Sequence, residues 1–145
     1  MEEIEPAAPA EVQEALRDVM ELARGLAVSR LEELDDPAAE ITPFGVVRTE
    51  SGLVPVLLDE VAEQLGNPDG MGRVAASLLG RYEADAFAIA ARWYSSPDGS
   101  PDHPQAREVM RVIVGHSDGL SGAIFAEIDR RPEGPRLSAV WEAVA

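Results

Sequence analysis

Two pairs of apolar segments joined by glycine-containing turns restrict the fold of this sequence more than any other feature. In the first pair, residues 41–49 are rich in β-branched side chains, residues 50–52 form a Glu-Ser-Gly turn signal, and residues 53–58 are a second apolar run. This pattern predicts a β-hairpin. Because proline cannot donate to a β-ladder, Pro55 predicts that the second strand has a free edge.

The second pair is residues 109–114 and 123–128, which flank a turn at Asp118-Gly119. It predicts another β-hairpin. Residues 86–93 alternate in the way a strand does, although alanines occupy one of the two faces. Hairpins rather than alternating strand–helix units indicate a mainly antiparallel sheet.

A long amphipathic helix is predicted over residues 10–35. Apolar side chains recur there in steps of three and four from Val12 to Leu34, which places them on one helical stripe. The Asp-Asp-Pro sequence at residues 35–37 ends the helix, because a residue before proline avoids the α region.

Three further helices and two loops complete the prediction. Asp59 is expected to cap a short helix, residues 67–70 are expected to form a turn, and helical spacing resumes from Met71 to Tyr82. Polar residues 95–105 and proline-bearing residues 130–136 are expected to be loops. The spacing of the last apolar side chains predicts a short C-terminal helix; they are Leu137, Val140, Trp141 and Val144.

These patterns predict one α+β domain spanning residues 1–145, with residues 1–9 as a flexible N-terminal segment. The expected architecture is a mostly antiparallel sheet of four or five strands, packed by the long N-terminal helix and the central helices. Its length suits a single hydrophobic core.

Charge and composition exclude several classes of protein. The net charge is −15, and the first forty residues hold 12 acidic side chains against 3 arginines. Such a field repels phosphate backbones and anionic lipids, so we expect neither nucleic-acid nor membrane binding. No cysteine is present, which excludes disulfides and thiolate metal sites. The acidic first residues do not resemble a secretory signal, and we expect a cytoplasmic protein.

One hydrolase-like motif is present by its letters. Residues 115–119, Gly-His-Ser-Asp-Gly, match the G-x-S-x-G pattern of a nucleophile elbow. That elbow requires a helix after the serine and a histidine later in the chain. Here a strand is expected after Ser117 and no histidine follows it, so the motif is interpreted as a hairpin turn.

A metal site is the second chemical hypothesis. The two histidines, His103 and His116, lie near Asp98, Asp102 and Asp118 in the sequence. These side chains would form a metal or small-ligand site if the 95–105 loop folded back over the 116–118 turn. The alternative is that both are solvated turn histidines, since no compact ligand spacing is present.

Two other segments carry weaker chemical signals. Residues 66–73 are glycine-rich, open a helix and end at Arg73, a combination that can bind anions, although Asp69 would repel phosphate. The acidic run within residues 32–40 could serve as an acid–base pair or hold Mg²⁺, but helix-end acids that face water are far more common. Trp141 is expected to cap the sheet or to join a dimer interface.

Two segments carry a family resemblance. The Thr-Pro-Phe-Gly sequence at residues 42–45 with its hairpin, and residues 111–119 with their return strand, resemble small bacterial proteins of unknown function. This resemblance implies no catalytic residues. The order of elements also resembles roadblock and longin-like modules, helix–sheet sandwiches that dimerise and bind small GTPases, which is an analogy of fold alone.

The sequence therefore favours a non-catalytic protein-interaction or regulatory module without a cofactor. We expect a homodimer, and a protein partner that contacts the acidic N-terminal helix. Two alternatives stay open: a small-ligand- or metal-dependent activity of the 98–103 loop and the 116–118 turn, and an acidic decoy for basic or nucleic-acid-binding proteins.

Overall fold

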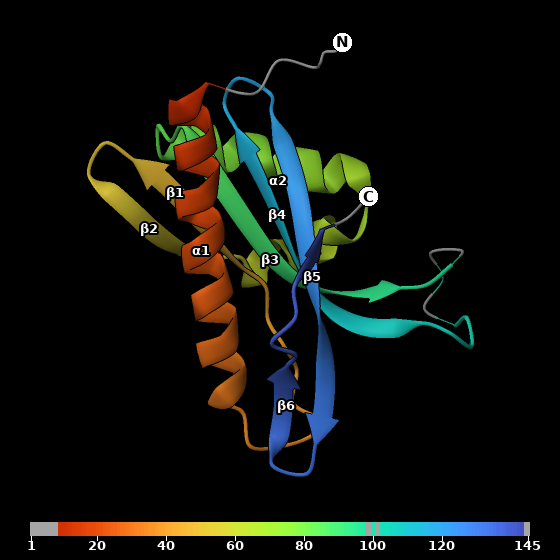
Figure 1. The fold of residues 1–145 in the computed structure, drawn as a ribbon. Helices are drawn as coiled ribbons and strands as arrows, with labels where there is room; N and C mark the ends of the chain where they lie inside the picture. The colour runs from red at the N-terminus through yellow and green to blue at the C-terminus, as the bar shows by residue number, and fades with distance from the viewer. Residues whose placement is uncertain (1–8, 98–99, 101, 144–145) are drawn as a thin grey trace.

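The fold is a strongly curved antiparallel sheet with helices on both faces (Figure 1). The computed structural model describes residues 9–97, 100 and 102–143. Its elements, in chain order, are α1 (Ala10–Glu32), β1 (Phe44–Thr49), β2 (Gly52–Leu57), the 3₁₀ helix η1 (Asp59–Gly66), α2 (Pro68–Arg81), β3 (Ala86–Ser95), β4 (Arg107–His116), β5 (Ser121–Arg131), β6 (Gly134–Leu137) and β7 (Glu142–Ala143). The strand order is β2-β1-β3-β4-β5-β6, and β7 pairs with β5.

The predicted α+β class and the antiparallel sheet are confirmed. Both predicted hairpins form, as β1–β2 and β4–β5, and α1 begins at the expected residue and ends three residues earlier than expected. The described part of the sheet has seven strands rather than four or five. Among the described residues, no helix has the length and apolarity needed to cross a membrane.

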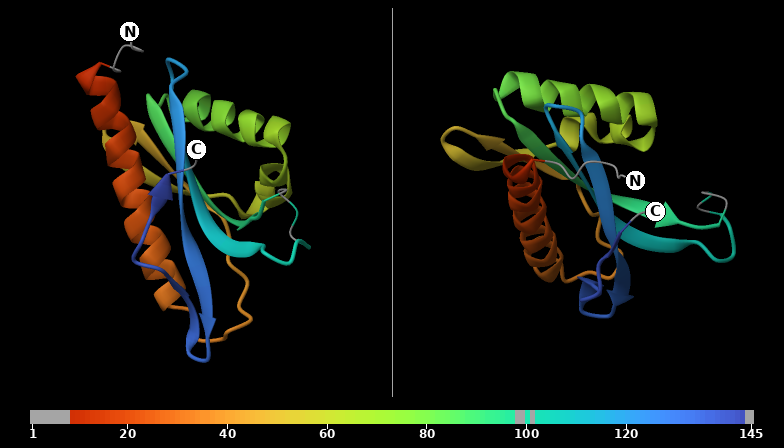
Figure 2. Two further views of the ribbon diagram at one scale, coloured as in Figure 1. Left: turned by 45° about the vertical axis from the view of Figure 1, so that its right-hand side comes forward. Right: turned by 45° about the horizontal axis from the view of Figure 1, so that its top comes forward.

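Helix α1 packs on one face of the sheet, and η1 and α2 pack on the other (Figure 2). The contact between α1 and β3 is made largely by small residues. Ala15, Ala23 and Ala27 of the helix are fully buried in the same cluster as Ala88 and Ala90 of the strand. Small side chains on both surfaces let the helix backbone lie close to the sheet, which explains the row of alanines in β3.

The second core lies between the opposite face of the sheet and the helices η1 and α2. Leu65, Val74 and Leu78 pack there against Phe87 and Ile89 of β3. Both faces of β3 are covered, so its side chains point alternately into the two apolar cores instead of alternating between a core and solvent. The strand is therefore apolar over most of its length.

The segment between β2 and α2 differs from the prediction. Asp59 is not a helix cap, since Leu58 occupies the cap position and η1 is a 3₁₀ helix with non-helical dihedrals at Val61. Residues 67–70 are not a free turn but the beginning of α2. Asn67 caps this helix by accepting a 2.7 Å hydrogen bond from the Gly70 N–H. Pro68 keeps Asn67 extended, so the two helices cannot merge.

The predicted loop over residues 130–136 is wrong. Strand β5 continues to Arg131, and β6 returns from Gly134 to Leu137 in antiparallel register with it. Pro135 lies inside β6, where it pairs with Arg130 and is fully buried. An edge strand tolerates a proline because its N atom can face away from the neighbouring strand.

The predicted C-terminal helix is also wrong. Leu137 ends β6, a bend follows in which Ser138 Oγ accepts the Val140 N–H, and β7 then pairs with β5. Leu137 and Trp141 still pack against the α1-side core, and Arg24 lies 5.3 Å from the Trp141 ring. Trp141 thus covers the sheet, which is one of its two predicted roles. Val144 lies outside the described residues.

Candidate protein-interaction edge

The two edges of the sheet differ in how well they are covered. One edge is formed by β6 and by the two-residue strand β7, both paired with β5. Strand β6 is also tied to α1, because Arg136 donates hydrogen bonds to the carbonyls of Leu31 (2.9 Å) and Leu34 (3.0 Å). At the other edge, β2 pairs with β1, and none of the described strands or helices lies along its outer side (Figures 1 and 2). Strand β2 is therefore the open edge, as Pro55 predicts.

The backbone of β2 is oriented so that it can accept another strand. Pro55 pairs with Val46 but has no N–H, so its N atom faces away from β1. Because alternate residues of an edge strand face the same side, Leu53 and Leu57 also point their N–H and C=O groups outward. Val54 and Val56 make the bonds to β1. No backbone hydrogen bond within the described residues uses these outward groups, so the outer edge presents two donors and three acceptors.

The side chains of β2 are apolar and exposed. Leu57 is 73 % exposed, Leu53 38 % and Val54 37 %, and these three are half of the large apolar side chains exposed in the described residues. The other three are on separate elements; they are Val28, Leu120 and Val140. No residue of β2 is charged. Edge strands are commonly blunted by charged side chains, by proline or by shortness, and β2 has a proline but no charged side chain.

A groove runs beside β2 on the face covered by α2. Its volume is about 830 Å³, and β2, η1 and α2 line it. The apolar wall includes Val56, Val61, Val74 and Leu78, whereas the α2 rim carries Arg73, Ser77 and Arg81, spaced four residues apart along one stripe. Such a groove can hold alternate side chains of an added strand.

Acidic side chains lie just beyond both ends of β2. Glu50 is in the hairpin turn before the strand, and Asp59 and Glu60 begin η1 after it. All three are exposed, and within the described chain none makes an ion pair. The uncharged strand is thus bounded by unpaired carboxylates at each end.

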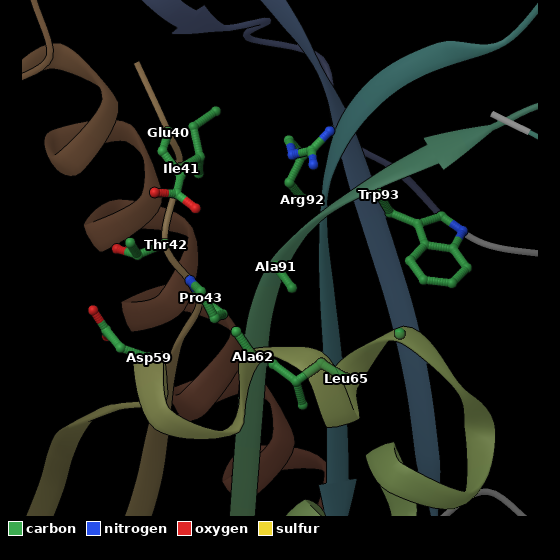
Figure 3. A pocket seen from close by; sticks show the side chains of 11 residues that line it. Glu40, Ile41, Thr42, Pro43, Asp59, Ala62, Leu65, Ala91, Arg92 and Trp93 are labelled. Atoms are coloured by element: carbon green, nitrogen blue, oxygen red, sulfur yellow. The ribbon is translucent and has the colours of Figure 1, made fainter. Parts of the chain in front are cut away.

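A second cavity lies between residues 40–43, η1 and β3 (Figure 3). Its volume is about 430 Å³, and its polar lining is Glu40, Thr42, Asp59 and Arg92. Arg92 is already engaged, because it donates to Tyr94 Oη at 2.6 Å and lies 3.5 Å from Glu108. In the part of the chain that is described, no hydrogen bond joins two of the four lining groups, so the cavity presents no assembled acid–base pair.

The most strongly coupled charges belong to a structural cluster. Arg130 makes two hydrogen bonds to Glu108, at 2.9 and 2.7 Å, and two more to the carbonyls of Pro37 and Ala39. The hydrogen bond from Arg130 lowers the pKa of Glu108 against the opposing effect of burial, and the same bond raises the pKa of Arg130. The cluster fastens the segment after α1 to β4 and β5.

The two candidate histidines lie far apart, although His116 Nδ1 is 3.2 Å from Asp118 Oδ1. His103 lies before β4 and His116 ends it, so about 30 Å of strand separates them. Each imidazole Nδ1 accepts a local backbone N–H, from Gln105 at 2.9 Å and from Asp118 at 3.1 Å. The metal hypothesis depends on closure of the 95–105 loop over the 116–118 turn, and the described residues of the two segments lie at opposite ends of β4 instead. Asp102 lies beside His103 in the loop before β4, and Asp98 lies outside the described residues.

The remaining candidate motifs have local roles. Residues 115–119 span the end of β4 and the hairpin turn that leads to β5, and a strand follows Ser117 as expected. In the acidic run, Asp36 accepts the Ala38 N–H at 2.8 Å, a bond within the loop after α1. Arg73 lines the groove beside β2. Across residues 9–97, 100 and 102–143, no group of three histidine or acidic side chains could hold a metal ion.

Comparison of the chain with protein families, with curated proteins and with solved structures finds no match.

Proposed function

We propose that this protein is a non-catalytic interaction module that binds an extended segment of another chain at β2. The observation that carries the proposal is an uncharged, apolar edge strand whose outward donors and acceptors are free. An incoming antiparallel strand would gain roughly five main-chain hydrogen bonds from Leu53, Pro55 and Leu57. Its side chains on the α2 face would enter the groove.

Photocrosslinking from the edge tests this proposal. A benzoylphenylalanine in place of Leu57 should form an adduct with another protein in the cells that make this chain. Leu120 is the matched control, because it is an exposed leucine (42 %) at the tip of the β4–β5 hairpin, away from the edge. An adduct formed from position 57 and not from position 120 supports binding at β2.

A second substitution tests whether the backbone of β2 forms hydrogen bonds with the partner. Leu53→Pro removes an outward N–H that β1 does not use, so the hairpin should persist while the adduct from position 57 is lost. Circular dichroism and the unfolding midpoint verify that the variant still folds. The proposal fails if positions 57 and 120 label the same proteins to the same extent, or if position 57 labels none.

A further inference from the structure

The charges around β2 indicate what kind of segment binds there, provided that the proposed function is correct. Glu50 lies before the strand and Asp59 and Glu60 lie after it, all exposed and without ion-pair partners in the described residues. We propose that the partner is an extended apolar segment with basic side chains at both of its ends. Because both ends of β2 are acidic, this preference is the same for either direction of the incoming strand.

The groove confines the positive charge of the partner to its ends. Arg73 and Arg81 lie on the α2 rim, and neither makes an ion pair within the described chain. They would repel a lysine or arginine that pointed from the middle of the segment into the groove. The middle of the partner is therefore apolar or uncharged, and it spans about 20 Å, the length of β2.

Net charge selects this partner over a second copy of the chain. Each copy carries a charge of −15. Pairing of two β2 strands about Pro55 would also set Glu50 of each copy near Glu60 of the other, because residues equally far from Pro55 come opposite each other. The same field attracts a basic segment and accelerates its association at low ionic strength.

Synthetic peptides provide the test. The first probe has an alternating valine–threonine core flanked on each side by two arginines. A second peptide has the same composition with the arginines in the middle, and a third has glutamates in place of the arginines. Fluorescence anisotropy at low salt should show binding of the first peptide alone, and the amide signals of Leu53 and Leu57 should shift in NMR spectra.

Two charge variants separate a local contact from general attraction. The double substitution Glu50→Gln with Glu60→Gln should weaken binding of the first peptide by about 2–30-fold, the range expected for two exposed ion pairs. Glu32→Gln with Glu33→Gln removes the same charge from exposed residues at the end of α1 and should leave binding unchanged. Equal weakening by the two double variants would overturn the inference.

The remaining outcomes distinguish the two proposals. If the glutamate-flanked or the rearranged peptide binds at β2 as tightly as the first, the partner chemistry is wrong and strand addition stands. If sedimentation shows a dimer that buries β2 and excludes every peptide, the occupant is a second copy. If no peptide binds and position 57 crosslinks to nothing, the proposed function fails as well.

Discussion

Replacing Arg130 by methionine tests the charge cluster that joins three parts of the chain. The guanidinium makes two hydrogen bonds to Glu108 and two to backbone carbonyls of the segment after α1. Methionine keeps the unbranched stem and removes all four. The Glu108 side chain is only 17 % exposed, and among the described residues it would retain one ion-pair partner, Arg92, at 3.5 Å.

The expected loss of stability follows from the Glu108 carboxylate, which loses its hydrogen bonds to Arg130 in the variant. A hydrogen bond to a charged group contributes about 1.5–3 kcal/mol, and partial exposure of Arg130 lets water replace part of this loss. We expect Arg130→Met to lower the free energy of unfolding by about 2–3 kcal/mol at neutral pH. In urea this corresponds to a midpoint lower by about 1–2 M.

The acid dependence should change in the same variant. Because the pKa of Glu108 is lowered in the folded state, its contribution is fully present above the unfolded pKa, about 4.3, and is lost as pH falls through the folded pKa. The wild-type protein should therefore lose more stability than Arg130→Met does as pH falls below about 4.3. Urea titrations at neutral pH and in this acid range measure both quantities.

Arg131→Met is the matched control. Arg131 pairs with Asp129 at 2.9 Å, but both side chains are more than half exposed, so the cost should stay under about 1 kcal/mol. The reasoning is refuted if the two variants unfold at the same urea concentration. It is also refuted if Arg130→Met retains the full acid sensitivity of the wild-type protein.

Three glycine substitutions test the packing, with the urea midpoint as readout. Gly134→Ala should cost more than about 2 kcal/mol, because φ is +128° and the new methyl would overlap the Leu34 carbonyl; an unchanged midpoint would contradict this turn. Gly115→Ala should cost about 1–3 kcal/mol because the buried ring of Phe87 covers that glycine, and a neutral effect would refute this contact. Gly72→Ala, in open space on α2, should instead stabilise by about 0.5–1 kcal/mol, and a loss would indicate a missed neighbour.

The elements that the sequence predicts correctly are determined by residues that lie close together in the sequence. Steps of three and four between Val12 and Leu31 bury one stripe of α1, and both hairpins are marked by glycine turns between apolar runs. The C-terminal region misleads for a physical reason. Leu137 and Trp141 are spaced as on a helix, yet they lie on either side of a bend and reach the same core. Pro135 indicates a loop unless the edge position of β6 is known.

The site shows the same division between local and distant causes. Pro55 marks β2 as an edge strand from the sequence alone. The groove beside it requires α2 to cross the sheet so that Arg73 and Arg81 face β2, and no local pattern specifies that crossing. Likewise, Glu108 and Arg130 are 22 residues apart and meet only because the register between β4 and β5 places them together.

Net charge and edge chemistry can be understood as parts of one arrangement. An exposed apolar strand risks pairing with copies of itself, and Pro55 removes only one of the donors along that edge. Repulsion between chains of charge −15 opposes such pairing at low and moderate salt, because the acidic ends of two β2 strands would have to approach each other. The same acidity does not hinder a segment of opposite charge. The net negative charge can therefore oppose self-association through the apolar edge strand β2 without hindering the binding of a basic partner there.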